Sequence, residues 1–111
     1  MRTVFYRSRT GRVPVREYVD SLPVRDQAAV ADVLGAIEEH GLAAPGVRFR
    51  VIRAKLWEFY IEGGASHRVF YVVVRGPTMV LLHAYKKQSR KAPRSEIDIA
   101  ERRMKEVLHG N

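Results

Sequence analysis

The feature that most constrains this chain is a run of four strand-like segments between residues 47 and 87. They cover residues 47–53, 56–62, 67–75 and 79–87, and short turns rich in glycine separate the later ones. In the first two segments apolar and polar residues alternate, which is typical of a strand with one buried face. Consecutive strands with short connections pair as an antiparallel meander, so we expect one antiparallel sheet here.

Helical patterns lie on both sides of this run. Apolar residues recur at helical spacing over residues 14–22 and 23–40, and a third helix opens at Pro93. Residues 2–7 are β-branched and aromatic, as in a first strand. The expected fold is α+β, in the order β-α-α-β-β-β-β-α. An antiparallel hairpin of the first two helices should cover one face of the sheet and leave the other partly open.

The chain has 111 residues, which is enough for one hydrophobic core, so we expect a single domain over 1–111. It has no cysteine, which excludes disulfides, a thiol nucleophile and zinc sites of the cysteine type. No stretch approaches eighteen apolar residues, and the first residues lack the apolar run of a signal peptide. We therefore expect a cytoplasmic protein.

The formal net charge is +8, and it is unevenly distributed along the chain. Residues 17–39 contain six acids and one base. Three other segments, 1–16, 40–57 and 75–95, are rich in arginine and lysine and contain no acids. A basic surface of this kind indicates an anionic partner, most often nucleic acid or the ribosome. If the three basic segments meet on the open face of the sheet, that face is the expected binding surface.

Several motifs give the chain a wider resemblance. They are Leu56-Trp57-Glu58-Phe59, Arg68-Val69-Phe70-Tyr71, the run from Leu81 to Pro93 (Leu-Leu-His-Ala-Tyr-Lys-Lys-Gln-Ser-Arg-Lys-Ala-Pro), and Glu96-Ile97-Asp98-Ile99-Ala100. Over nearly its whole length the chain resembles the phage-derived Gp49-like family, which belongs with the HigB/RelE toxins of type II toxin–antitoxin systems. The most specific motif is the run that precedes the last helix.

The resemblance implies a RelE-like curved sheet with a helical hairpin behind it, and a toxin that cleaves mRNA on the 70S ribosome. It also implies a co-encoded helix-turn-helix antitoxin, similar to HigA, as partner. Two positions depart from the family pattern. Tyr60 stands where an arginine is common, and Ala92 stands where a threonine or serine often precedes the helix-opening proline. The first departure puts cleavage efficiency in question, and the second removes an expected helix cap.

RNA cleavage needs a base for the 2′-hydroxyl, stabilisation of the negative charge that develops on the phosphorane, and an acid for the leaving oxygen. Arg68, which matches a family arginine, is the first candidate for binding the phosphate. Lys86 and Lys87 are candidates for charge stabilisation or general acid catalysis, and His83 for the base. The expected RNA-binding residues are Lys55, Tyr85, Arg90, Lys91, Arg50 and Arg53. No histidine or acid cluster has the spacing of metal ligands, so we expect neither metal nor cofactor.

Other interpretations of these side chains remain open. His83 could instead be structural, bonded to a neighbouring strand or to Glu58, and Glu58 could act as a base, although pairing with Arg68 is the favoured interpretation. We expect His67 to be exposed and Trp57 to be part of the core. For the whole protein, the alternatives are a ParE-like inhibitor of DNA gyrase with the same fold, and a non-catalytic RNA- or ribosome-binding module.

Overall fold

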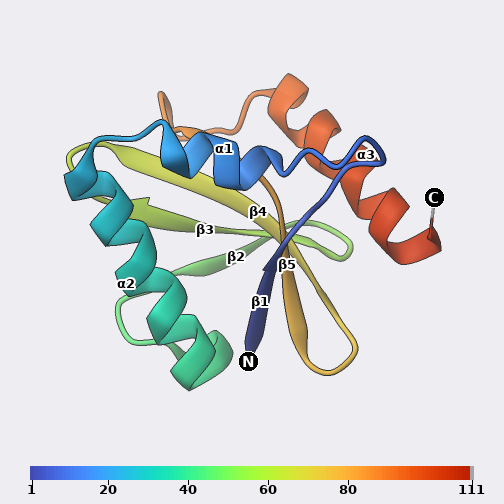
Figure 1. Cartoon of the computed structure of the whole chain (residues 1–111), viewed down its shortest axis with the longest axis horizontal. Coiled ribbons are helices and arrows are strands. Elements are labelled where there is room, and N and C mark those ends of the chain that lie inside the picture. Colours follow the sequence, from blue (N-terminus) through green and yellow to red (C-terminus); the bar gives the residue numbers. More distant parts are fainter. Residues whose placement is uncertain (111) are drawn as a thin grey trace.

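The computed structural model describes residues 1–110, which form one five-stranded sheet with helices packed on both of its faces (Figure 1). The elements, in chain order, are β1 (Arg2–Phe5), α1 (Pro14–Asp20), α2 (Val24–His40), the short 3₁₀ helix η1 (Gly41–Ala43), β2 (Phe49–Arg53), β3 (Leu56–Glu62), β4 (Ser66–Val74), β5 (Thr78–Lys86) and α3 (Arg94–His109). The mixed α+β class and this order of elements are confirmed. None of the described helices is long and apolar enough to cross a membrane.

The strand order across the sheet is β1-β5-β4-β3-β2. Strands β2 to β5 form the expected antiparallel meander, whereas β1 pairs with β5 in parallel. The expectation of a wholly antiparallel sheet is therefore wrong for its first strand. The reason is connectivity, because a parallel pair needs a long crossover, and the chain between β1 and β5 supplies one that includes both N-terminal helices.

Helices α1 and α2 cover one face of the sheet, which we call the hairpin side. Val15 of α1 and Val30 and Ile37 of α2 pack there against Phe59 of β3 and Tyr71 of β4. The chain reverses its direction between the two helices, which diverge from their junction (Figure 1). Only residues 21–23 join them, and each helix packs its apolar stripe on the sheet.

Helix α3 covers part of the opposite face, which we call the α3 side. Ala100 and Met104 of α3 pack there against Phe70, Val72 and Leu82. A bulge in β5 changes the side-chain alternation, because Phe70 is paired with His83 while the next residue, Tyr71, is paired with Leu81. Strict alternation predicts that His83 shares a face with Met79 and Leu81. Because of the bulge, His83 lies on the α3 side, whereas Met79 and Leu81 lie on the hairpin side.

Candidate nucleic-acid interface

A basic groove opens on the sheet beyond the part that α3 covers. Its volume is about 500 Å³, and it is lined by Arg48, Phe49, Arg50, Tyr60, Lys87 and Arg90. Arg50 and Tyr60 come from the paired strands β2 and β3, Lys87 follows the end of β5, and Arg90 belongs to the loop before α3. Strand pairing thus brings together cations from two parts of the sequence that are almost forty residues apart. We call this surface the basic groove.

Two residues that line the basic groove, Arg50 and Tyr60, bind one buried carboxylate that is not itself exposed in the groove, that of Glu58, which is 0% exposed. Its Oε2 atom accepts hydrogen bonds from Nε of Arg50 at 2.9 Å and from the hydroxyl of Tyr60 at 3.0 Å. Its Oε1 atom accepts one from Nη1 of Arg68 at 3.0 Å. A buried charge is tolerated only when it is paired and hydrogen-bonded, and Glu58 meets this condition with three donors. The favoured interpretation, that Glu58 pairs with Arg68, is confirmed.

The sequence predicted that Arg68 binds phosphate on an open face of the sheet. In the structure, Arg68 does not lie on an open face. Its side chain is 0% exposed, so the guanidinium has no surface on which to meet a phosphate. Besides Glu58, it binds the carbonyl oxygens of Ser89 at 3.2 Å and Arg90 at 3.0 Å. Arg68 is buried for two reasons. Strand β4 is paired on both sides, with β3 and β5, and the loop before α3 covers the side chain. Arg68 therefore connects the sheet to the loop that carries Arg90.

Tyr60 lies at the centre of the basic groove. The Nζ atom of Lys87 is 5.7 Å from the centre of its ring, and the guanidinium carbon of Arg68 is 5.2 Å from it. Burial and the neighbouring Glu58 carboxylate raise the pKa of the Tyr60 hydroxyl, so this group stays protonated at neutral pH. The ring thus faces cations, and its hydroxyl is engaged by Glu58.

His83 lies under α3 and is not among the residues that line the basic groove. Its Nε2 atom is 2.7 Å from Oε1 of Glu96, and its Nδ1 atom is 3.3 Å from Nη1 of Arg103. The expected partners in the structural interpretation, a neighbouring strand or Glu58, are therefore wrong, because the partner is on α3. Burial lowers the pKa of the His83 imidazole, and Glu96 opposes this shift in part.

Five of the other predicted residues also lie apart from the basic groove. Arg53 binds Glu101 of α3 at 3.2 Å, and Lys55 lies in the turn between β2 and β3, at the opposite end of β3 from the groove. Lys86 lines a different groove on the hairpin side. Lys91 is exposed in the loop before α3. Tyr85 packs near Arg68, 6.0 Å from its guanidinium carbon, and burial raises the pKa of its hydroxyl to about 12.

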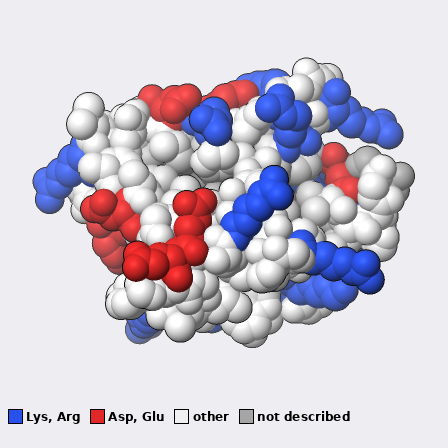
Figure 2. Space-filling view, turned by 60° about the horizontal axis from the view of Figure 1, so that its bottom comes forward, with Lys and Arg blue, Asp and Glu red and all other residues white. Residues whose placement is uncertain are grey.

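Of the three basic segments, only two meet at the basic groove. Residues 48–50 and 87–90 contribute its cations, whereas the first segment lies elsewhere: Arg12 forms an ion pair with Glu17, and the guanidinium of Arg16 lies over the ring of Phe5. The expectation that all three converge is therefore wrong, because β1 is at the far edge of the sheet from β2. Figure 2 shows acidic side chains gathered in a group on the left of one face, with the larger basic groups on the right.

Two residues of this region were misjudged from the sequence. His67, expected to be exposed, is 2% exposed, and its Nε2 atom is 2.6 Å from Oδ2 of Asp26. Trp57 faces the hairpin side as alternation predicts, but it is 37% exposed and so is not a core residue. Arg48, which was not among the predicted site residues, lines the basic groove, and its alternation with Arg50 was the signal that could have identified it.

The family model described as phage-derived protein Gp49-like matches residues 17–105 of the chain, which includes every residue that lines the basic groove. No curated protein matches the chain significantly.

Proposed function

This chain belongs to the phage-derived Gp49-like family, which is associated with toxins of toxin–antitoxin systems, and we propose that it is a toxin that cleaves mRNA on the ribosome. The observation that carries this proposal is the basic groove, where Arg48, Arg50, Lys87 and Arg90 surround Tyr60. Four cations that face one groove are suited to the closely spaced phosphates of a single RNA strand. The order of elements is the one that the family resemblance led us to expect.

In the proposed reaction the RNA 2′-oxygen forms a bond to the adjacent phosphorus, and the bond from phosphorus to the 5′-oxygen breaks. Negative charge develops on the phosphate oxygens, where the guanidinium of Arg50 and the ammonium of Lys87 stabilise it. Lys87 then donates a proton to the leaving 5′-oxygen. Glu58 and Arg68 are positioning residues in this scheme, because one holds the Arg50 guanidinium and the other holds the loop that carries Arg90.

The groove gives a reason for dependence on the ribosome. Among the residues that line it in the described part of the chain there is neither a carboxylate nor an imidazole, and the Tyr60 hydroxyl is held protonated. The groove thus offers cations and an acid, but its side chains offer no base for the 2′-hydroxyl. We therefore propose that the ribosome orients the mRNA and that a basic group of the ribosome or a water molecule accepts this proton. The same proposal includes a co-encoded helix-turn-helix antitoxin as the protein partner of this chain.

The test is to express wild-type protein and Lys87→Ala in cells and to map mRNA ends. We expect wild-type protein to arrest growth and to produce new mRNA ends within translated regions, and Lys87→Ala to reduce these ends about 10²-fold or more. Lys105→Ala is the matched control, because Lys105 is an exposed lysine of α3 outside the groove. Growth arrest with intact mRNA and inhibited gyrase would contradict the proposal and favour the ParE-like alternative.

A second candidate function is a non-catalytic RNA- or ribosome-binding module. It is favoured by the positions of Arg68 and His83, two of the predicted catalytic residues, which both lie outside the groove. Purified protein mixed with ribosomes and a labelled mRNA separates the two. Ribosome binding that depends on Lys87 but leaves the mRNA intact would support the binding module.

A further inference from the structure

A second groove, of about 490 Å³, opens on the hairpin side of the sheet. It lies where the junction of α1 and α2 meets the turn between β3 and β4. Its lining residues are Tyr18, Leu22, Pro23, Arg25, Asp26, Gly64, Ala65, His67 and Lys86. We call it the hairpin groove. Val24, next to Pro23 in the chain, is 81% exposed, the largest value among the exposed large apolar residues of the described chain.

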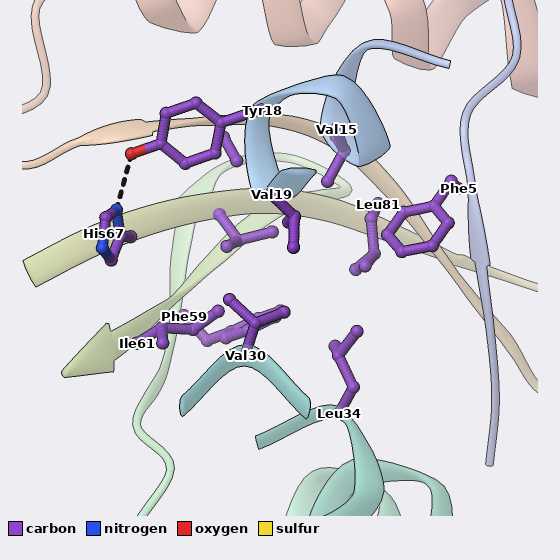
Figure 3. A pocket seen from close by; sticks show the side chains of 12 residues that line it. Phe5, Val15, Tyr18, Val19, Val30, Leu34, Phe59, Ile61, His67 and Leu81 are labelled. Carbon is purple, nitrogen blue, oxygen red and sulfur yellow. Dashed lines mark hydrogen bonds between the residues drawn. The ribbon is translucent and has the colours of Figure 1, made fainter. Parts of the chain in front are cut away.

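The polar wall of the hairpin groove is already satisfied from within the protein. The carboxylate of Asp26 accepts hydrogen bonds from the backbone N–H groups of Gly64, at 2.7 Å, and Ala65, at 3.2 Å, and from Nε2 of His67. With Nε2 donating, Nδ1 of His67 accepts a hydrogen bond of 2.5 Å from the Tyr18 hydroxyl, which is the dashed line in Figure 3. These bonds, led by that from His67, lower the pKa of the Asp26 carboxyl. The wall is therefore rigid, and its only carboxylate is engaged.

The two cations of the hairpin groove are, by contrast, unpaired. Arg25 and Lys86 form no ion pair with any residue between 1 and 110. They come from different elements, since Arg25 lies in the first turn of α2 and Lys86 ends β5. Two unpaired cations that flank an apolar surface of Leu22, Pro23 and Ala65 match a ligand with an apolar side chain next to carboxylates.

The hairpin groove and the basic groove lie on opposite faces of the same end of the sheet. Lys86 and Lys87 are neighbours in the chain, and each lines a different one of the two grooves. His67, opposite Lys86 in the β4–β5 register, faces the hairpin side, whereas the next residue, Arg68, faces the α3 side. A ligand in the hairpin groove therefore leaves the basic groove free for RNA.

We propose that the hairpin groove is the docking site for a short acidic segment of a protein partner. An apolar side chain of the segment rests on Leu22, Pro23 and Ala65. Its flanking carboxylates bind Arg25 and Lys86, and Val24 extends the apolar contact. This inference goes beyond the proposed nuclease activity and does not depend on it, because the docking surface excludes the basic groove.

The probe is a capped synthetic peptide, Gly-Glu-Glu-Leu-Trp-Glu-Glu-Leu-Gly, added to the ¹⁵N-labelled full chain. We expect amide shift changes centred on Gly64, Ala65 and Lys86. Two control peptides are used, one with lysine in place of each glutamate and one with serine in place of each leucine and tryptophan. Both are expected to bind about tenfold more weakly or not at all, because one lacks the charge and the other lacks the apolar anchor.

Neighbouring lysines provide the matched variants. Lys86→Glu is expected to weaken peptide binding by about fivefold or more. Lys87→Glu makes the same change in net charge, so it reports the general loss of attraction, and we expect it to change the peptide affinity by no more than about twofold. Arg25→Glu should weaken peptide binding like Lys86→Glu and should leave the mRNA ends produced in cells unchanged. Failure of the docking proposal is thus distinguishable from failure of the proposed nuclease function.

Several results would overturn the docking proposal. They are shift changes centred on Arg48, Arg50 and Arg90, equal losses of peptide binding in Lys86→Glu and Lys87→Glu, equal binding by the serine-containing peptide, and absence of binding by any peptide. A single-stranded oligoribonucleotide that shifts Gly64 and Lys86, where the peptide does not, would assign the hairpin groove to RNA instead.

Discussion

The most consequential single residue is Glu58, because three cationic or hydroxyl donors depend on its one buried carboxylate. Arg68, its inner partner, is as fully buried as Glu58 itself. Such a pair adds little net stability relative to apolar residues of similar size, since removing both charges from water is costly. Breaking it is a different matter, because one charge is then left buried without a partner.

We therefore predict that Glu58→Met lowers the free energy of unfolding by about 3–5 kcal/mol. The double variant Glu58→Met/Arg68→Met should be considerably more stable than the single one, because it leaves no unpaired buried charge. Urea unfolding followed by circular dichroism measures both. If the free energy of unfolding of the single variant lies within about 0.5 kcal/mol of the wild-type value, the three donors do not depend on Glu58 as we describe.

His83 provides a prediction about pH. Because its pKa in the folded protein lies below its ordinary value of about 6.5, the unfolded chain binds the extra proton more readily. The contribution of His83 to stability is therefore fully present above pH 6.5 and decreases as the pH falls through the folded-state pKa. An NMR titration of the His83 ring should give a midpoint below 6.5, and Glu96→Gln should lower it further. A midpoint at or above 6.5 in wild type contradicts the prediction.

At the level of elements, the turn between β3 and β4 is held against the start of α2. A Cβ atom on Gly63 would lie 2.8 Å from Oδ1 of Asp26 and 3.3 Å from its Cα atom. The contact with the backbone of α2 cannot be relieved by a side-chain rotation, so a larger residue at this position requires the turn or the start of α2 to shift. The close approach brings the Gly64 and Ala65 amides within reach of the Asp26 carboxylate.

We predict that Gly63→Ala destabilises the protein by about 1–3 kcal/mol, a cost typical of overpacking. Gly35→Ala is the matched control, because it lies inside α2 with no atom within 4 Å of the added Cβ. That substitution should stabilise the protein by about 0.5–1 kcal/mol through helix propensity. Thermal unfolding of the two variants tests the pair, and equal shifts of the same sign would refute the packing argument.

The N-terminus of α3 differs from the expectation that Ala92 removes a helix cap. Pro93 is itself the N-cap residue, and Ala92 is 8% exposed and packs in the α3-side core. A threonine at position 92 would therefore place a hydroxyl in the core, and restoring the family residue is not expected to add a cap. The α3 N-terminus depends on packing and not on a side-chain oxygen.

For the whole molecule, net charge and local charge have different consequences. A charge of +8 attracts any polyanion, but only the cations of the basic groove contact RNA in the proposed complex. The acids of residues 17–39 lie mainly on the helices of the other face, where they favour one orientation of the approaching RNA.

We predict that binding of a single-stranded oligoribonucleotide weakens with salt with a slope of roughly −2 to −3 in a plot of log Kobs against log salt concentration, which corresponds to three or four phosphate contacts. Lys87→Ala should reduce the magnitude of the slope by about 0.7. Arg7→Ala, which removes the same charge far from the groove, should leave the slope unchanged. Equal slopes in both variants would mean that net charge alone attracts RNA.

By itself, the sequence determined the α+β class, the order of the elements, most of their bounds and the family. These follow from local periodicity and turn residues, or from a motif that spans residues 81–93. Only the tertiary structure decided which side chains are exposed. Arg68 is enclosed by the loop before α3, and His67 is enclosed by Tyr18 and Asp26 of the two N-terminal helices. The position of His83 depends on the bulge in β5 and on α3. The parallel pairing of β1 depends on the long crossover between β1 and β5. The assignment of Lys86 and Lys87 to opposite faces depends on strand register, because a shift of one residue exchanges the two faces of a sheet.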